Sequence, residues 1–287
     1  MDKIIGLGQT GCRIAEQLTE YPEYRVYKID SEIKERASLS LGVHLGMDDY
    51  EKNLDQEEVA IYLRSIKETD GVLLVVEGGT PISGAALGIL ETIKNARLNV
   101  LYVCPDISML TETQKRDNKI AFGVLQEYAR SGMFESIFLV SSNMVDRMLG
   151  DVTIDEYHSR FAYFVSYAVA MINYFNHSIP VVANRGETPV GCRILTLGSP
   201  LLENEQPPLN LFFPLEEING IHFYYGIPEN EIKDDTALLA RIKSHVRFYQ
   251  QEGVSTSFSV YSTTLSEKVS FCVAYSEKVQ SLSSTPG

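Results

Sequence analysis

The stretch Glu77-Gly78-Gly79-Thr80-Pro81-Ile82-Ser83-Gly84-Ala85-Ala86 lies between an apolar run, 71–76, and a segment with helical patterning. A glycine-rich turn between a strand and a helix lets phosphate approach the backbone, and the helix N-terminus favours its negative charge. A similar turn, Gly6-Leu7-Gly8-Gln9-Thr10-Gly11, follows the first apolar run of the chain. Two such loops, about seventy residues apart, indicate an α/β domain that holds a nucleotide from two sides.

Strand and helix patterns alternate through the first half of the chain. The apolar runs predict strands at 3–7, 25–30, 71–76, 100–104 and 136–141. The helical patterns predict helices at 11–18, 31–37, 56–66, 83–95 and 117–131, and residues 38–52 are expected to form a loop. This alternation predicts βαβ units and a parallel sheet that is covered on both faces.

A long helix is predicted next, from about Thr153 to Phe175, with Thr153 as its N-cap and Glu156 three residues later. Its second part is apolar almost all round, so we expect it to be buried between two masses of protein. The pattern then changes to strands at 193–197, 221–225, 255–261 and 268–275, with one helix at 235–251. We therefore expect an N-terminal domain at 1–152, a connecting helix at 153–176 and an α+β domain at 177–287.

Composition excludes several classes of function. The net charge of −13 argues against nucleic acid or an anionic membrane as a direct partner. Neither the four cysteines (Cys12, Cys104, Cys192, Cys272) nor the five histidines have metal-ligand spacing, so we expect neither a metal site nor a disulfide framework. The chain enters a strand at once and has no apolar run as long as a membrane span, which predicts a soluble, cytoplasmic protein.

The first glycine loop also fits a dinucleotide fingerprint. Gly6, Gly8 and Gly11 have the G-x-G-x-x-G spacing, and Asp30 follows Gly11 by nineteen residues. Asp30 could hold a ribose hydroxyl, or it could cap the helix expected from Ser31. An NAD-dependent oxidoreductase would leave the C-terminal strands and helix without a role, and any tight strand–helix turn favours glycine.

The second loop resembles the phosphate loop of the tubulin/FtsZ superfamily, which reads G-G-G-T-G-[ST]-G. Aligned without gaps, Gly78-Gly79 and Ser83-Gly84 match it, and Ala85-Ala86 continue the FtsZ-like pattern. The likeness extends over nearly the whole chain, through the strand that ends at Asn143 to the C-terminal strand–helix–strand–strand order. With 287 residues and no long C-terminal extension, the chain looks closer to short phage- or plasmid-type members than to a eukaryotic tubulin.

The resemblance implies an α/β, two-domain fold of the tubulin/FtsZ type that binds GTP or GDP, with Mg²⁺ as a further candidate. It implies a homopolymer built by head-to-tail contacts, or a tubulin- or FtsZ-like partner. Glu187 is the implied catalytic acid, and it would reach into the neighbouring subunit. The implied nucleotide contacts fall on Gly8, Gln9, Thr10, Gly11, Cys12, Gly78, Gly79, Thr80, Ser83, Gly84, Asn143 (sugar) and Phe161 (base).

The chain departs from the family at three places. Pro81 has no N–H to donate to a phosphate, and Ile82 puts a branched side chain where glycine allows close approach. At the base-reading position, Phe161-Ala162 cannot form hydrogen bonds to guanine. In place of the family's N-x-D-x-x-[DE] acids the chain has Asn184-Arg185-Gly186-Glu187, with a single acid.

Two functions therefore stay open. In the first, the protein binds GTP, forms filaments and hydrolyses the nucleotide at the subunit interface. In the second, it is a degenerate tubulin-like protein without nucleotide chemistry, and it acts as a structural or filament-regulating protein. The intact first loop favours the first function, and the three departures favour the second.

Overall fold

The structure is a computed structural model that describes residues 1–184, 191–202 and 208–282. The chain forms two compact units, which we call unit 1 and unit 2. Unit 1 comprises Met1–Tyr167 together with the segment from Val279, and unit 2 comprises Ala168–Lys278. The division falls within a single long helix, α7 (Ile154–Asn176), which confirms the long helix expected from the sequence.

Unit 1 contains a parallel sheet with the strand order β3-β2-β1-β4-β5-β6. Its strands are β1 (Lys3–Leu7), β2 (Arg25–Asp30), β3 (Ser38–Ser40), β4 (Gly71–Glu77), β5 (Arg97–Cys104) and β6 (Ser136–Ser141). Every residue of β4 except Glu77 is buried, as expected for a continuously apolar strand at the centre of a parallel sheet. The mixed α/β fold expected from the sequence is confirmed.

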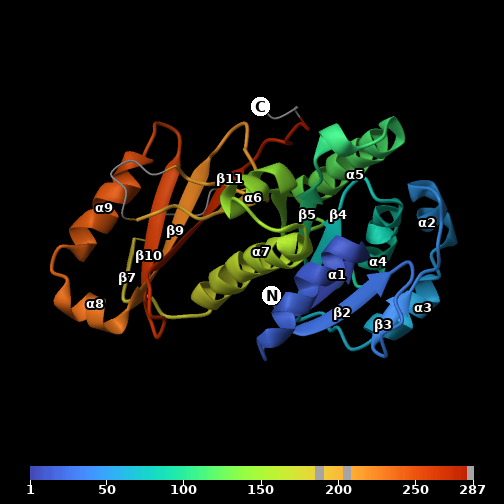
Figure 1. The fold of residues 1–287 in the computed structure, drawn as a ribbon, viewed down its shortest axis with the longest axis horizontal. Helices are drawn as coiled ribbons and strands as arrows, with labels where there is room; N and C mark the ends of the chain where they lie inside the picture. Colours follow the sequence, from blue (N-terminus) through green and yellow to red (C-terminus); the bar gives the residue numbers. More distant parts are fainter. Residues whose placement is uncertain (185–190, 203–207, 283–287) are drawn as a thin grey trace. The chain divides into compact units, whose positions relative to one another are not determined.

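Helices alternate with these strands along the chain (Figure 1). The α-helices of unit 1 before α7 are α1 (Gly8–Gln17), α2 (Met47–Asn53), α3 (Gln56–Leu63), α4 (Ala86–Thr92), α5 (Glu112–Arg130) and α6 (Ser142–Leu149). Three short 3₁₀ helices, η1 (Leu18–Glu20), η2 (Pro81–Ala85) and η3 (Ile107–Met109), complete the set. A capping box between Thr111 and Gln114 fixes the start of α5.

The segment from 31 to 52 differs from expectation. No helix forms at 31–37, because this stretch is mostly exposed and has no apolar stripe to bury. The Asp30 carboxylate instead accepts a 2.7 Å hydrogen bond from the N–H of the next residue, Ser31. The expected loop at 38–52 contains β3 and α2, and α2 buries Tyr50 within an otherwise charged sequence.

Parallel strands place their ends at two opposite edges of the unit 1 sheet. The carboxyl ends of β1, β4, β5 and β6 lead into α1, η2, η3 and α6, and we call this the carboxyl edge. The loops 64–70 and 93–96 lead into β4 and β5 at the other side, the amino edge. Ligands of open α/β sheets bind at the carboxyl edge.

Unit 2 has a mixed sheet with the order β8-β11-β9-β10-β7. Its strands are β7 (Val182–Asn184), β8 (Ile194–Gly198), β9 (Gly220–Pro228), β10 (Ser255–Thr263) and β11 (Val269–Ser276). Two helices, α8 (Glu229–Asp234) and α9 (Leu238–Phe248), connect the parallel pair β9 and β10. Four expected strands are confirmed, whereas β7 was not expected and the helix predicted at 235–251 is shorter.

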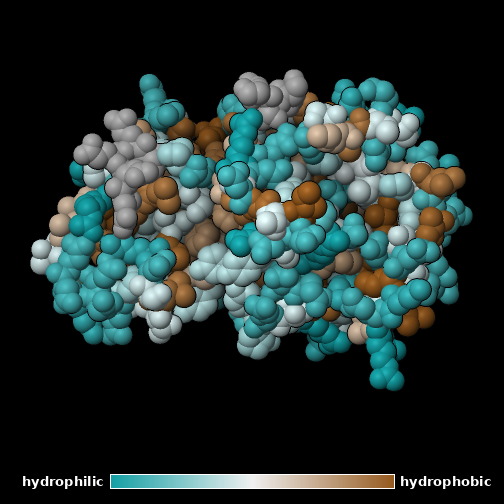
Figure 2. All heavy atoms as spheres, viewed as in Figure 1, coloured by the Kyte–Doolittle hydropathy of each residue, from teal (hydrophilic) through white to brown (hydrophobic). Residues whose placement is uncertain are grey.

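Hydrophilic residues cover most of the face drawn in Figure 2, and smaller hydrophobic areas lie between them. This agrees with the high content of acidic side chains in the sequence. Within the described part of the chain, no helix is long and apolar enough to cross a membrane.

Candidate functional site

The first glycine loop places a helix N-terminus at the carboxyl edge of unit 1. β1 ends at Leu7, and α1 begins at Gly8, whose φ of +73° is favourable for glycine. No side chain caps this helix, and Gln9 in its first turn is exposed. The start of α1 therefore keeps the positive end of a helix dipole open to an anion.

The other glycines of this loop are needed for packing. A Cβ on Gly11 would lie 2.4 Å from the Val75 carbonyl oxygen, and one on Gly6 would lie 2.5 Å from the Gly11 carbonyl oxygen. Cys12 is buried, and its thiol donates to the Gly6 carbonyl at 3.3 Å. Burial raises the pKa of Cys12 to about 12. Gly11 and Cys12 thus hold α1 against the sheet, although the resemblance assigned both to the nucleotide.

In the second loop, protein atoms fill the space beside Gly78. A Cβ there would lie 1.9 Å from the Tyr102 Oη and 2.1 Å from the Asn118 Oδ1. The Tyr102 hydroxyl donates to the Asn118 Oδ1 at 2.7 Å, and both residues are fully buried. The Gly78 N–H donates to the Val103 carbonyl at 3.0 Å. Packing thus accounts for this glycine without a phosphate.

Two further residues of the second loop, Thr80 and Ser83, form hydrogen bonds within it. Ser83 donates to the Thr80 carbonyl through its backbone N–H at 3.1 Å and its hydroxyl at 2.7 Å. The Thr80 hydroxyl donates to the Glu77 carbonyl at 2.9 Å. A Cβ on Gly84 would lie 2.1 Å from the carbonyl oxygen of Met47 in α2. The N–H groups of Gly78 and Ser83 and the hydroxyls of Thr80 and Ser83 are therefore already engaged inside the protein.

An isoleucine and a carboxylate lie between the two loops. Ile82 is only 6% exposed, and its Cγ2 would lie 2.9 Å from a Cβ on Gly8. The Thr10 hydroxyl donates to the Glu77 Oε2 at 2.6 Å. The place where two phosphate loops would face each other therefore contains an apolar side chain and an acid.

A small cavity remains at this edge. Its volume is about 70 Å³, well below the roughly 300–1,000 Å³ of typical small-molecule sites. The Tyr157 ring lies 6.2 Å from the Phe161 ring, centroid to centroid. The cavity is lined by Thr10, Arg13, Glu77, Ser142, Tyr157, His158, Phe161 and Ala162.

Carboxylates dominate the charges around Tyr157. Burial raises the pKa of Glu77, and the hydrogen bond from Thr10 partly offsets this. Burial also raises the pKa of Asp146, which accepts a 2.8 Å hydrogen bond from the Tyr157 hydroxyl. Burial, the bond to Asp146 and the charges of Asp146, Glu77 and Asp106 together raise the pKa of Tyr157. Arg13 and Glu77 both line the cavity, and Asp146 adds a second carboxylate beside Tyr157.

The remaining predicted residues have other partners. Asn143 lies in the first turn of α6 and, after Ser108, forms a hydrogen bond that helps to lower the pKa of Asp106. Glu187 lies outside the described residues. Asn184, at the start of the proposed catalytic loop, is the last residue of β7 and pairs with Phe258 of β10.

The structure thus brings together Thr10 and Phe161 at the cavity, and Gly8 with the second loop. Sequence reasoning missed Glu77, Tyr102 and Asn118, which determine the chemistry of the edge. Glu77 could have been noticed, because an acid at the start of a phosphate loop disfavours phosphate. Within the described ranges, no group of three or more His, Cys, Asp or Glu residues could hold a metal ion.

These observations together test the fit of a guanine nucleotide. Ile82 lies between the loops, Glu77 adds a half-buried acid that accepts from Thr10, and the cavity beside them has a volume of about 70 Å³, below that of typical small-molecule sites. The residues present do not fit the nucleotide that the resemblance implied.

Comparison with known proteins gives matches to solved structures alone. No family model matches the sequence, and no curated protein matches it. An empty FtsZ dimer from M. jannaschii is 11% identical with a TM-score of 0.68, and the match covers 95% of this chain and 87% of that one. CetZ2 from Haloferax volcanii, in a GTPγS-bound protofilament, is 14% identical with a TM-score of 0.70, covering 96% and 92%.

A third match is TubZ from Bacillus thuringiensis serovar israelensis, in a GTPγS-form protofilament. It is 13% identical with a TM-score of 0.68, and the match covers 96% of this chain and 86% of that one. Identities this low show a shared fold, and the coverage extends over almost the whole chain. The protein therefore has the two-domain tubulin/FtsZ fold on a short chain of 287 residues.

Proposed function

We propose that this protein is a structural protein of tubulin fold whose subunits associate head to tail without a bound nucleotide. The observation that carries the proposal is the position of Ile82, which is buried against Gly8 between the two glycine loops. An apolar side chain there takes the place of a phosphate and offers it no hydrogen bond. Glu77 adds a carboxylate at the same place.

Assembly is supported by the kinds of structure that share the fold. The matching FtsZ is a dimer, and the matching CetZ2 and TubZ are protofilaments. A head-to-tail contact joins two different surfaces of the subunit, so it does not close and produces filaments. The proposed filament would be cytoplasmic and would need neither GTP hydrolysis nor Glu187 as a catalytic acid.

A second candidate function is a GTP-binding filament protein that hydrolyses GTP at the subunit interface. The uncapped start of α1 at Gly8 favours it, because this helix end attracts an anion. The matching CetZ2 and TubZ structures are GTPγS forms. In this version Ile82 and Glu77 would have to move aside when GTP binds.

Sedimentation of the purified protein with and without GTP and Mg²⁺ tests assembly. The proposal predicts the same amount of polymer, and the same critical concentration, in both samples. Polymer that forms only with GTP, together with release of phosphate, would support the second candidate and overturn the proposal.

A gain-of-binding variant tests the role of the second loop. Replacing Ile82→Gly together with Glu77→Gln removes the apolar side chain and the acid between the loops. We expect the variant to bind a fluorescent GTP analogue at least tenfold more tightly than the wild type, measured by anisotropy. Ile179→Gly is a matched control, because Ile179 is 93% exposed and lies in unit 2. Tight binding by the wild type would show that Ile82 and Glu77 do not exclude nucleotide.

A further inference from the structure

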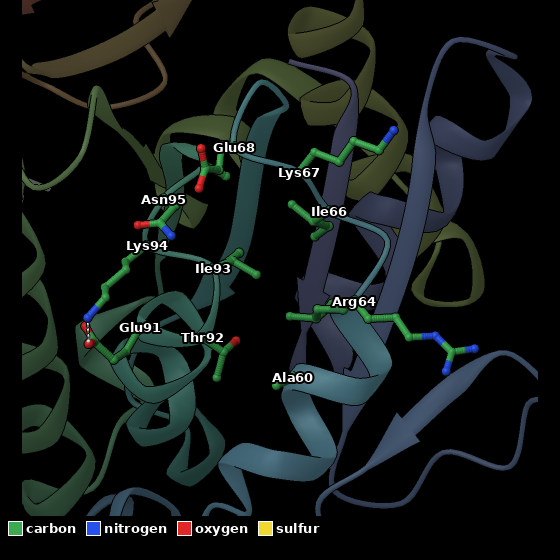
Figure 3. A pocket seen from close by; sticks show the side chains of 12 residues that line it. Ala60, Arg64, Ile66, Lys67, Glu68, Glu91, Thr92, Ile93, Lys94 and Asn95 are labelled. Carbon is green, nitrogen blue, oxygen red and sulfur yellow. Dashed lines mark hydrogen bonds and ion pairs between the residues drawn. The ribbon is translucent and has the colours of Figure 1, made fainter.

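We propose that a slot at the amino edge of unit 1, lined in part by isoleucine side chains, receives an exposed apolar turn from the carboxyl edge of a second copy of this chain. This inference rests on the proposed function, because it supplies one contact of the nucleotide-independent assembly. The slot lies between the C-terminal ends of α3 and α4 and the loops that follow them (Figure 3).

The slot has the size and lining of a site for one side chain. Its volume is about 210 Å³, below the range of roughly 300–1,000 Å³ for drug-sized ligands. Ile66 and Ile93 face each other across it (Figure 3), and Leu63 contributes to the same lining. A leucine or valine of a partner would therefore bury its side chain between these residues.

The rim of the slot carries positive charge on a chain that is otherwise acidic. The charged ends of Arg64 and Lys67 reach outward from the α3 wall (Figure 3), and neither forms an ion pair with another described residue. Glu68 also lines the slot and lies beside Asn95 in Figure 3, and Lys94 on that side is paired with Glu91 at 2.7 Å. The unpaired cations favour an acidic occupant.

A turn at the carboxyl edge has the complementary character. Val43 is 63% exposed and Leu45 is 93% exposed, although both are apolar. Asp48 and Asp49, both exposed, follow in the first turn of α2, three and four residues after Leu45. The turn thus presents apolar side chains beside carboxylates, as the slot and its cations require.

Tyr50 fixes the conformation of this turn. It is 3% exposed, its hydroxyl donates to the Gly42 carbonyl at 2.9 Å, and the same hydroxyl accepts from the His44 N–H at 3.3 Å. The His44 ring packs edge-on against Tyr50 with centroids 4.8 Å apart. A turn held in this way exposes Leu45 without a further loss of backbone entropy on binding.

The turn and the slot lie at opposite edges of the same sheet. The backbone of Met47 packs against Gly84 in the second glycine loop, which places α2 at the carboxyl edge. The loops of the slot lead into the amino ends of β4 and β5. The turn at the carboxyl edge of one copy would insert into the slot at the amino edge of the next. Copies joined in this way are arranged head to tail, and the same contact repeats along a filament. It would anchor a larger interface in the way a hot spot does.

Cysteine cross-linking tests the contact directly. The four native cysteines are buried, so an introduced pair should react selectively. Mixing a tagged Leu45→Cys variant with an Ile66→Cys variant should give a disulfide-linked heterodimer under mild oxidation without nucleotide. The double variant should give a ladder of dimers, trimers and higher species, whereas either single variant alone should give no ladder.

Charge reversal provides an independent test that keeps the fold. Arg64→Glu with Lys67→Glu should weaken association about tenfold or more, measured by sedimentation equilibrium. Asp48→Lys with Asp49→Lys should do the same, and mixing the two variants should restore association between them. Equal changes at the exposed Lys233 and Lys243 of unit 2 are the matched control and should have little effect.

The outcomes separate this inference from the proposed function. Polymer without nucleotide, but no heterodimer and no effect of charge reversal, would overturn the slot and leave the proposed function standing. Cross-links that form only with GTP would support the slot and overturn nucleotide independence. A wild-type protein that stays monomeric under both conditions would overturn both.

Discussion

The two glycine loops of unit 1 sit at the same edge of one sheet, yet their glycines have different surroundings. In the first loop, Gly6 and Gly11 pack against backbone carbonyls, and Gly8 begins an uncapped helix whose next residue, Gln9, is exposed. In the second, Tyr102 and Asn118 fill the space beside Gly78, and a backbone carbonyl fills that beside Gly84. Glycines of both loops therefore make room for neighbouring parts of the protein, and the first loop differs in carrying the uncapped start of a helix.

The largest expected effect is that of Gly78→Ala. The added Cβ would meet two buried side-chain atoms at 1.9 and 2.1 Å and disrupt the hydrogen bond between them. We expect the free energy of unfolding to fall by about 3 kcal/mol, measured by urea denaturation. Gly123→Ala in α5 is the matched control, because its Cβ would meet no atom within 4 Å. A neutral Gly78→Ala would show that the second loop has room for a ligand.

A smaller effect is expected for Gly8→Ala in the first loop. Its φ of +73° costs a side-chain-bearing residue about 1–2 kcal/mol, and the nearest atom belongs to the flexible end of Ile82. The loss of stability should therefore be less than for Gly78→Ala in the same denaturation experiment. A larger loss of stability for Gly8→Ala than for Gly78→Ala would contradict the difference that we describe between the two loops.

The smallest effect is expected for Glu77→Gln, and it should depend on pH. Because burial raises the pKa of Glu77 above its ordinary 4.5, the folded state keeps this proton to higher pH than the unfolded chain does. Wild-type stability should thus fall as the pH rises from about 4.5 through the raised pKa. The glutamine still accepts from Thr10, so the variant should be more stable than the wild type at neutral pH and equal to it at acidic pH.

Thermal unfolding at several pH values measures this difference. The nearby thiol of Cys12 does not contribute to the pH dependence, because its pKa is raised to about 12 and it does not titrate in this range. A variant that is less stable than the wild type at neutral pH would show that the Glu77 carboxylate stabilises the edge in its charged form.

Local pattern was sufficient to predict most of unit 1. The continuous apolar run of β4 and the apolar length of α7 follow from burial alone. Helix α2 was missed because a sequence of acids with one buried tyrosine looks like a solvated loop. The helix expected at 31–37 was wrong, since this stretch is mostly exposed and has no apolar stripe to bury.

The sequence predicted which two loops form the candidate site, but it did not predict which side chains fill the space beside their glycines. Glycine spacing correctly indicated which two loops meet at the carboxyl edge. The contacts that fill the second loop come from Tyr102, Asn118 and Met47, which lie on β5, α5 and α2. Only the folded chain shows that these distant residues occupy the space next to Gly78 and Gly84. Pro81 and Ile82 could be recognised in the sequence as departures from the family's loop. The structure explains Ile82, which is buried against Gly8.

The most direct measurement is calorimetric titration of the folded wild-type protein with GTP and Mg²⁺, with GDP and ATP alongside. Our account predicts no binding heat with any of the three, because Ile82 and Glu77 lie where phosphate would bind. GTP-selective binding with a Kd below about 10 μM would contradict it. That result would mean that the second loop opens to admit the nucleotide.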